Sequence, residues 1–143
     1  MVIANNIEEL IPHKGLMCLL DKIENWDENE ILCTAISHLN PNNPLKIKGK
    51  LHIIHGLEYA AQAMAVHGKL LNPKSARLPG LLAGTRNLKL YGRFLDNIKE
   101  PLRIQARSLV ITNYGLGYSF SVFANKKELL SGECTINFPS KNA

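Results

Sequence analysis

Residues 55–68 read HGLEYAAQAMAVHG, and the fold follows from this stretch. Almost every residue in it is small or apolar, including four alanines and a glycine near each end. Alanine has the highest helix propensity, so the stretch predicts a helix that runs from about Leu51 or His55 to Leu71. Small side chains on nearly all sides allow another layer to approach the helix backbone closely. We therefore predict one long, buried helix.

Strand-like segments lie on both sides of this helix in the sequence. The alternation of apolar and polar residues is clear at Leu102, Ile104 and Ala106. The predicted strands cover residues 17–26 and 30–38 before the helix, and about 80–91, 102–112, 115–125 and 128–138 after it. Short turns join successive strands and favour an antiparallel sheet. A short helix over about 6–11 and an irregular segment over 39–50 complete the predicted α+β fold.

Length and composition are those of one soluble globular domain covering residues 1–143. Hydrophobic residues make up 45% of the chain and charged residues 20%. The N-terminus lacks the features of a secretion signal, and no segment approaches the roughly 18 apolar residues that cross a bilayer. We expect a cytoplasmic protein that does not enter the membrane.

The cysteines and the charge narrow the possible functions. Cys18, Cys33 and Cys134 are odd in number and show no CxxC spacing, so we expect reduced thiols and no metal site. The formal net charge is +5, but the basic residues are scattered and form no arginine-rich run. We therefore expect no nucleic-acid binding, and an acidic carrier protein is the better candidate partner.

Two polar side chains interrupt the apolar helix. Glu58 and Gln62 are four residues apart and share a face, and His55 lies three residues before Glu58 on the same face. If this face is buried, an unpaired carboxylate is costly, which favours the protonated form that a general acid needs. Spacing alone favours a plainer alternative, in which Glu58 faces solvent and interacts with the helix dipole.

The start of the helix offers a second chemical group. Backbone N–H groups at a helix N-terminus have no partner inside the helix, and Gly56 would leave them accessible. We predict that these donors polarise a carbonyl oxygen. A carboxyl group beside such donors suits chemistry at the carbon next to a carbonyl group.

The five histidines differ in how well their positions in the sequence suit a catalytic role. His38 ends a predicted strand and enters the proline-rich segment, where catalytic groups are often placed. His13 follows the first predicted helix, and His55 lies on the Glu58 face. We predict structural roles for His52, which precedes the helix without a clear partner, and His67, which lies about half a turn away from Glu58.

Four segments, in this order and at these spacings, resemble the hotdog-fold 3-hydroxyacyl-(acyl-carrier-protein) dehydratases, in the branch associated with aryl-polyene biosynthesis in bacteria. These segments are IPHKGLMCLLDKI (11–23), SHLNPNNPL (37–45), GLEYAAQAMAVHG (56–68) and LPGLLAGTRNLKL (78–90). The resemblance covers about residues 7–138. It implies a sheet wrapped around one central helix, and two subunits that join their sheets side by side.

The resemblance also implies an active site between subunits. A carboxylate from the helix of one subunit works with a histidine from the other, and the acyl chain arrives on the phosphopantetheine of acyl carrier protein, without another cofactor or a metal. Glu58 matches the helix carboxylate. Gly56 would then direct an N–H group at the thioester oxygen, and Gln62 would support the site from the next turn.

One feature departs from the family pattern. The fatty-acid dehydratases carry their histidine in an HFPGxPxxPG loop about 14 residues before the carboxylate, and Pro44 occupies that place here. His38 is the nearest upstream histidine and is predicted to be the general base, with His13 and His55 as rivals. If His38 is the base, His13 and His55 are predicted to bind the substrate, together with Gly56 and Gln62.

The predicted activity is that of a hydro-lyase. A 3-hydroxyacyl thioester on acyl carrier protein would lose water to give a trans-2-enoyl thioester, in fatty-acid-like or polyene biosynthesis. The alternatives are an acyl-thioester hydrolase and a non-catalytic partner subunit of a heterodimeric dehydratase. The protein is therefore expected to form either a homodimer or a heterodimer with a related hotdog subunit.

Overall fold

The structure, a computed structural model, describes residues 7–11, 15–74 and 81–138. In this part of the chain the helix is α1 (Gly56–Leu71). The strands are β1 (Lys22–Trp26), β2 (Glu30–Ala35), β3 (Leu81–Leu90), β4 (Leu102–Ile111), β5 (Gly115–Ala124) and β6 (Lys127–Asn137). Four single 3-10 turns are η1 (Ile7–Glu9), η2 (Gly15–Met17), η3 (Ser37–Leu39) and η4 (Ile53–His55).

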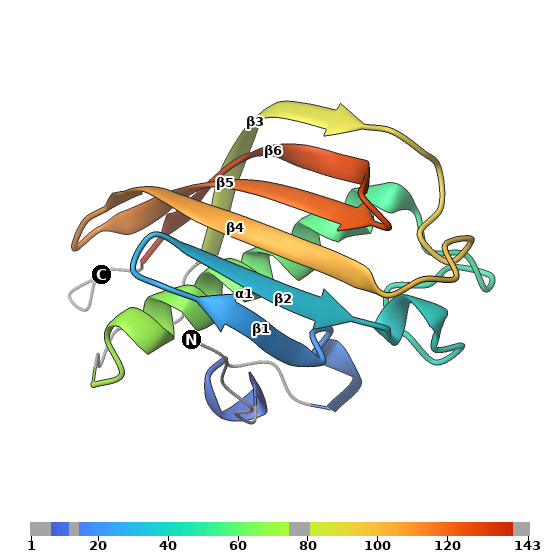
Figure 1. Ribbon diagram of the computed structural model, residues 1–143, viewed down its shortest axis with the longest axis horizontal. Coiled ribbons are helices and arrows are strands. Elements are labelled where there is room, and N and C mark those ends of the chain that lie inside the picture. The colour runs from blue at the N-terminus through green and yellow to red at the C-terminus, as the bar shows by residue number, and fades with distance from the viewer. Residues whose placement is uncertain (1–6, 12–14, 75–80, 139–143) are drawn as a thin grey trace.

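The strands form one antiparallel sheet that curves over α1 (Figure 1). Their order across the sheet is β1-β2-β4-β5-β6-β3. The predicted α+β fold and its single long helix are confirmed. The last four predicted strands are also confirmed, each to within one or two residues at its ends.

The N-terminal elements are shorter than predicted. The strand predicted over 17–26 begins only at Lys22, because the backbone of residues 17–19 is hydrogen-bonded to the Gln62 side chain instead of a neighbouring strand. The strand predicted over 30–38 ends at Ala35, and η3 follows it. In place of the helix predicted over 6–11, the described residues contain the 3-10 turn η1.

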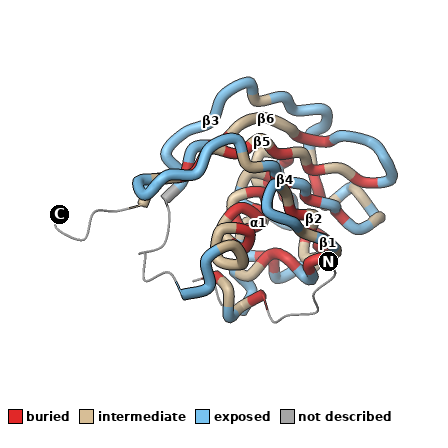
Figure 2. Tube along the Cα trace, turned by 60° about the vertical axis from the view of Figure 1, so that its left-hand side comes forward, coloured by how far each residue is buried: buried red, intermediate tan, exposed pale blue. Residues whose placement is uncertain are grey.

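The core lies between α1 and the inner face of the sheet, where the buried residues gather in Figure 2. Every second residue of β5, from Leu116 to Ala124, is buried, as the alternating pattern predicts. On α1, Tyr59, Ala60, Ala63 and Met64 have no exposed surface. The small side chains allow the sheet to approach: a Cβ atom at Gly56 would lie 2.5 Å from Leu130 Cδ2 of β6.

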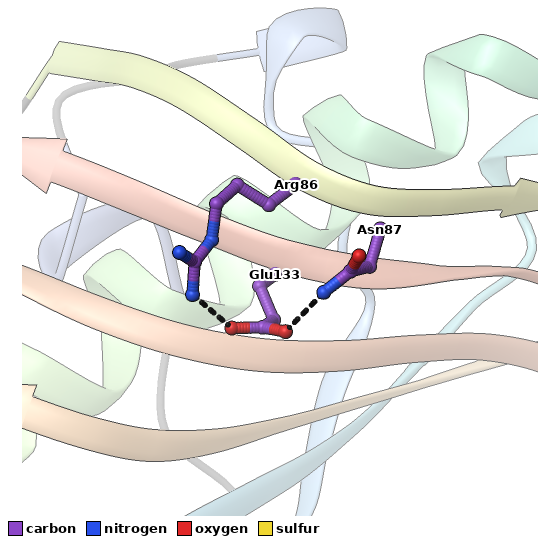
Figure 3. A network of polar contacts seen from close by, with 3 residues as sticks. All are labelled: Arg86, Asn87 and Glu133. Atoms are coloured by element: carbon purple, nitrogen blue, oxygen red, sulfur yellow. Dashed lines mark hydrogen bonds and ion pairs between the residues drawn. The ribbon is translucent and has the colours of Figure 1, made fainter.

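The two edges of the sheet differ. β1 has five residues, whereas β3 has ten and is exposed for most of its length (Figure 2). A bulge interrupts β3 between Arg86 and Lys89, with Asn87 in the left-handed region at φ 54°. Figure 3 shows how Glu133 of β6 holds this bulge: its carboxylate accepts hydrogen bonds from Arg86 at 3.1 Å and from Asn87 at 2.8 Å.

Candidate active site

The helical run that carries Glu58 begins three residues before α1, because η4 leads directly into it. The first four amide groups of this run all have partners. Ile53 N–H donates to Arg93 O at 2.9 Å, Ile54 N–H to His52 Nδ1 at 3.1 Å, His55 N–H to His52 O at 3.0 Å, and Gly56 N–H to the carbonyls of Ile53 and Ile54. The start of the helix is therefore already capped by the protein itself.

This capping corrects the role predicted for Gly56. Its N–H group was expected to be free for a thioester oxygen, but it is engaged by η4, and Gly56 itself is buried. The glycine is required because Leu130 of β6 packs where a side chain would lie.

Glu58 lies in the first turn of α1 and is exposed. Within the part of the chain that the structure describes, no hydrogen bond or ion pair holds its carboxylate. The burial considered in the sequence analysis is thus not met in the single chain, and the solvent-facing alternative describes its position. A carboxylate without a partner, on a helix that is otherwise largely buried, is free to contact a substrate or a second subunit.

Gln62 does not face the same surroundings as Glu58. It is 3% exposed, its Oε1 accepts a hydrogen bond from Leu19 N–H at 2.8 Å, and its Nε2 donates to Met17 O at 2.6 Å. The side-chain amide therefore pairs with the backbone as a strand would. It fixes the segment between η2 and β1 against α1, which is a structural role.

His38, the predicted general base, is fully buried. Its Nε2 lies 2.9 Å from Ile98 O and 3.1 Å from Glu100 O, and carbonyl oxygens only accept, so Nε2 carries the proton. Nδ1 is buried and has no hydrogen-bond partner in the described chain. Burial lowers the pKa of His38, while the two carbonyl contacts act in the opposite direction. In the described chain Nε2 is therefore occupied and Nδ1 is covered, which makes His38 a poor candidate for the general base.

Of the two rival histidines, the structure describes His55 and not His13. His13 lies outside the described residues. His55 is partly exposed at the N-cap position of α1, and its side chain makes no capping hydrogen bond. It remains a prediction for substrate binding beside Glu58.

His52 and His67 have structural roles, as predicted. His52 caps η4 through Nδ1 and packs edge-on against Phe94. His67 is fully buried, and its Nε2 donates to Asp27 O at 2.7 Å, so its Nδ1 accepts from the Tyr118 hydroxyl at 2.5 Å. His67 thereby ties α1 to the turn between β1 and β2 and to β5. Burial lowers the pKa of His67 and raises the pKa of Tyr118.

These two buried imidazoles predict a loss of stability in mild acid. The pKa values of His38 and His67 lie below the ordinary value of 6.5 in the folded chain, so the unfolded chain binds more protons below pH 6.5. The free energy of unfolding should therefore fall as the pH drops from 6.5 to 5, by up to about 1.4 kcal/mol per pH unit for each histidine. Urea unfolding at pH 7.5, 6.5 and 5.5 measures this.

The His67→Phe variant separates the contribution of the buried histidines from that of the carboxylates, because it removes one of the two histidines. At pH 7.5 its free energy of unfolding should be lower than that of the parent. Between pH 7.5 and 5.5 its free energy of unfolding should fall by less than that of the parent. A urea midpoint that stays constant over this range would refute the prediction.

A second polar network, not predicted from the sequence, lies beside η3. Ser37 Oγ donates to Leu19 O at 2.7 Å and accepts from the Tyr59 hydroxyl at 2.8 Å, and Asn43 Nδ2 donates to the same hydroxyl at 3.2 Å. It borders a surface depression of about 410 Å³ lined by Gly15, Leu16, Cys18, Asp21, Ile36, Ser37, Leu39, Asn40 and Asn43. Adjacent Ser37 and His38 thus serve separate structural contacts.

The described residues contain no group of three or more His, Cys, Asp or Glu side chains arranged to hold a metal ion. Nor does any helix among them have the length and apolar character needed to cross a membrane. Cys33 and Cys134 are buried thiols, and Cys18 is partly buried. Of Glu58 and His38, the two predicted catalytic residues, Glu58 is exposed and His38 is fully buried in the described chain.

The sequence matches a known protein family over almost its full length. The family model described as ApeP dehydratase, ApeP-like, matches residues 5–143. The chain belongs to the ApeP-like dehydratase family. Among curated proteins, none matches the sequence.

Solved structures confirm the fold of this ApeP-like chain. A chain of the dehydratase heterocomplex ApeI:P from Xenorhabdus doucetiae superimposes with a TM-score of 0.86 at 19% identity, over 98% of this chain and 95% of that one. A putative thioesterase from Silicibacter sp. TM1040 superimposes with a TM-score of 0.67 at 13% identity, over 98% and 95% of the two chains. A mutant thioesterase from Pseudomonas aeruginosa gives 0.60 at 10% identity, over 82% and 79%.

The antiparallel sheet around one central helix is therefore the hotdog fold, as the sequence resemblance implied. The family is one of dehydratases, whereas the fold is shared with thioesterases. Fold alone does not decide between these activities.

Proposed function

We propose that this ApeP-like chain is one subunit of a dehydratase whose active site forms between two hotdog subunits. The substrate is a 3-hydroxyacyl thioester on the phosphopantetheine of acyl carrier protein, and the product is the trans-2-enoyl thioester, in fatty-acid-like or polyene biosynthesis. One observation carries the proposal. Glu58 is an exposed, unpaired carboxylate on the central helix of a dehydratase-family chain, while His38 of the same chain is buried and held by backbone carbonyls.

Elimination of water needs a base and an acid on the two reacting carbons. A histidine of the second subunit removes the proton from the carbon next to the thioester, and the electron pair forms the new double bond. Glu58, protonated, gives its proton to the leaving hydroxyl as the carbon–oxygen bond breaks, which releases water. The position of Glu58 supports this role, because the residue is exposed in the first turn of α1 and its carboxyl group can contact a substrate bound between the two subunits.

The exposed β3 edge supports assembly with a second subunit. Leu82 and Leu90 of this strand are 41% and 43% exposed, and the outer side of the strand pairs with no other described strand. Long exposed edges of this kind readily accept another strand. A related hotdog subunit that supplies the histidine is the proposed partner, and the ApeI:P neighbour is itself a heterocomplex.

Thioester hydrolysis is the second candidate, since hotdog neighbours of this chain include thioesterases. Glu58 would then activate or position a water molecule. The products separate the two functions: a dehydratase gives an enoyl thioester, whereas a hydrolase gives a free acid and a thiol.

The proposal is tested by measuring dehydration with three samples. They contain this chain alone, a related hotdog dehydratase subunit alone, and the two mixed, each with a 3-hydroxyacyl-pantetheine substrate. We expect the mixture to form enoyl product faster than the sum of the separate samples. Full activity of this chain alone, with no gain on mixing, would show that the site needs no second kind of subunit. Release of free acid without enoyl product would favour the hydrolase.

A further inference from the structure

A hairpin rich in lysine lies just before α1, the helix that carries Glu58. Ile47 and Lys50 pair as an isolated bridge, with both backbone hydrogen bonds formed at 2.8 and 3.0 Å. The two residues between them, Lys48 and Gly49, have φ values of 52° and 77°, as a tight two-residue turn requires. The segment from Lys46 to Lys50, named here the basic hairpin, therefore has a defined shape although it lies in the irregular part of the sequence.

The basic hairpin is joined to a second segment that adds positive charge. Lys50 Nζ lies 5.6 Å from the centre of the Phe94 ring, and Arg93 Cζ lies 5.3 Å from it. Asp96 offsets part of this charge, because its carboxylate is 3.7 Å from Lys50 Nζ and accepts from Leu51 N–H at 2.8 Å. Lys48 and Arg93 are exposed and make no ion pair within the described chain.

This charged surface is fixed to the end of the helix that carries Glu58. Leu95 N–H donates to Leu51 O at 2.7 Å, Ile53 N–H donates to Arg93 O at 2.9 Å, and His52 pairs with Phe94 as an isolated bridge. The backbone after the basic hairpin therefore runs, fully bonded, into η4 and then into α1. In Figure 1 the loops before α1 and after β3 meet at this end of the molecule.

An apolar side chain stands within the charged surface. Ile47 is 71% exposed, although a large apolar side chain gains nothing from contact with water. Protein interfaces commonly combine an apolar contact with a charged rim that steers the partner. The basic hairpin has both parts within five residues.

We propose that the basic hairpin and Arg93 form the docking surface for an acidic carrier protein that delivers its acyl thioester to Glu58. This inference rests on the proposed function, because it names where the carrier of that substrate binds. The positive charge of Lys46, Lys48 and Arg93 attracts the acidic surface, and Ile47 makes the apolar contact. Docking at this end places the thioester arm at the start of α1.

The test measures binding separately from catalysis. Holo-acyl carrier protein is titrated, at low and at physiological salt, against the chain assembled with its dehydratase partner. We expect Lys48→Glu to weaken binding at least about fivefold, because it replaces an attraction with a repulsion of surface ion-pair size. Lys48→Glu/Arg93→Glu should weaken it further, and added salt should reduce the difference between parent and variants.

Lys74→Glu is the matched control, since Lys74 is an exposed lysine just beyond the other end of α1. It should bind the carrier like the parent. All variants should turn over the free 3-hydroxyacyl-pantetheine substrate at the parent rate, because this small substrate needs no docking surface. Absence of carrier binding by the parent, equal binding by the Lys48 variants, or equal weakening by Lys74→Glu would overturn the inference. If the parent complex does not dehydrate the free 3-hydroxyacyl-pantetheine substrate, that result would instead count against the proposed function.

Discussion

The Glu58→Gln variant should lose between about a hundredfold and ten-thousandfold of the dehydratase activity gained on mixing with the partner subunit, because that range is typical of a general acid. Glutamine keeps the size of the side chain but has no proton to give to the leaving hydroxyl. Since Glu58 is exposed and unpaired in the described chain, its replacement should leave the melting temperature unchanged. Loss of activity with an intact fold would assign the carboxyl group to the reaction.

Glu28→Gln provides the control for this experiment. Glu28 is an exposed carboxylate in the turn between β1 and β2, away from the first turn of α1, and it makes no ion pair in the described chain. This variant should retain the parent's activity. If Glu58→Gln dehydrates the pantetheine substrate as fast as Glu28→Gln does, then Glu58 is not the acid and the proposed mechanism fails.

The Gln62→Leu variant should lose about 1–3 kcal/mol of the free energy of unfolding, which is the usual cost of one buried group left without a hydrogen-bond partner. Leucine fills much of the same space but leaves the buried Leu19 N–H group unsatisfied, whereas Met17 is 38% exposed and its carbonyl can bind water instead. Urea unfolding at pH 7.5 measures the loss. The size of the effect follows from burial, since Gln62 is only 3% exposed.

Two further variants make the assignment of Gln62 specific. Gln62→Glu keeps an oxygen to accept from Leu19 N–H but removes the donor to Met17 O, so it should also destabilise the fold. Gln105→Leu changes an exposed glutamine on β4 and should alter stability by no more than about 0.5 kcal/mol. If Gln62→Leu unfolds at the same urea concentration as Gln105→Leu, then the hydrogen bonds of Gln62 to Leu19 and Met17 do not contribute to stability.

Regular patterns made most of the fold predictable. The alternation in β4 and β5 and the alanine-rich helix each depend on residues close in the sequence, and they were placed correctly. The start of β1 was misplaced because its backbone partner is a side chain 43 residues away, which no local pattern records. The hairpin at Ile47–Lys50 was also not predicted, because lysine is not among the residues typical of the first central position of such a turn.

The candidate site was only partly predictable for a related reason. Glu58 stood out because a carboxylate is unusual on so apolar a helix. The accessibility of the Gly56 amide depended on whether the preceding residues were helical, and η4 decided that. For His38 the deciding contacts are Ile98 and Glu100, some 60 residues away in the chain. A polar residue in a loop can serve the core as readily as a substrate, and only its distant neighbours distinguish the two.

The place of β3 in the sheet has a consequence for how the protein is made. β3 precedes β4 and β5 in the chain, yet among the described strands it pairs only with β6, which follows them both. During synthesis β3 must therefore wait for β4, β5 and β6 to emerge from the ribosome before it has a neighbour. Pairing between such distant segments is slow, since the intervening chain must first be ordered. The edge proposed for subunit pairing is thus completed only after β6, which delays association through this edge until β6 has been synthesised.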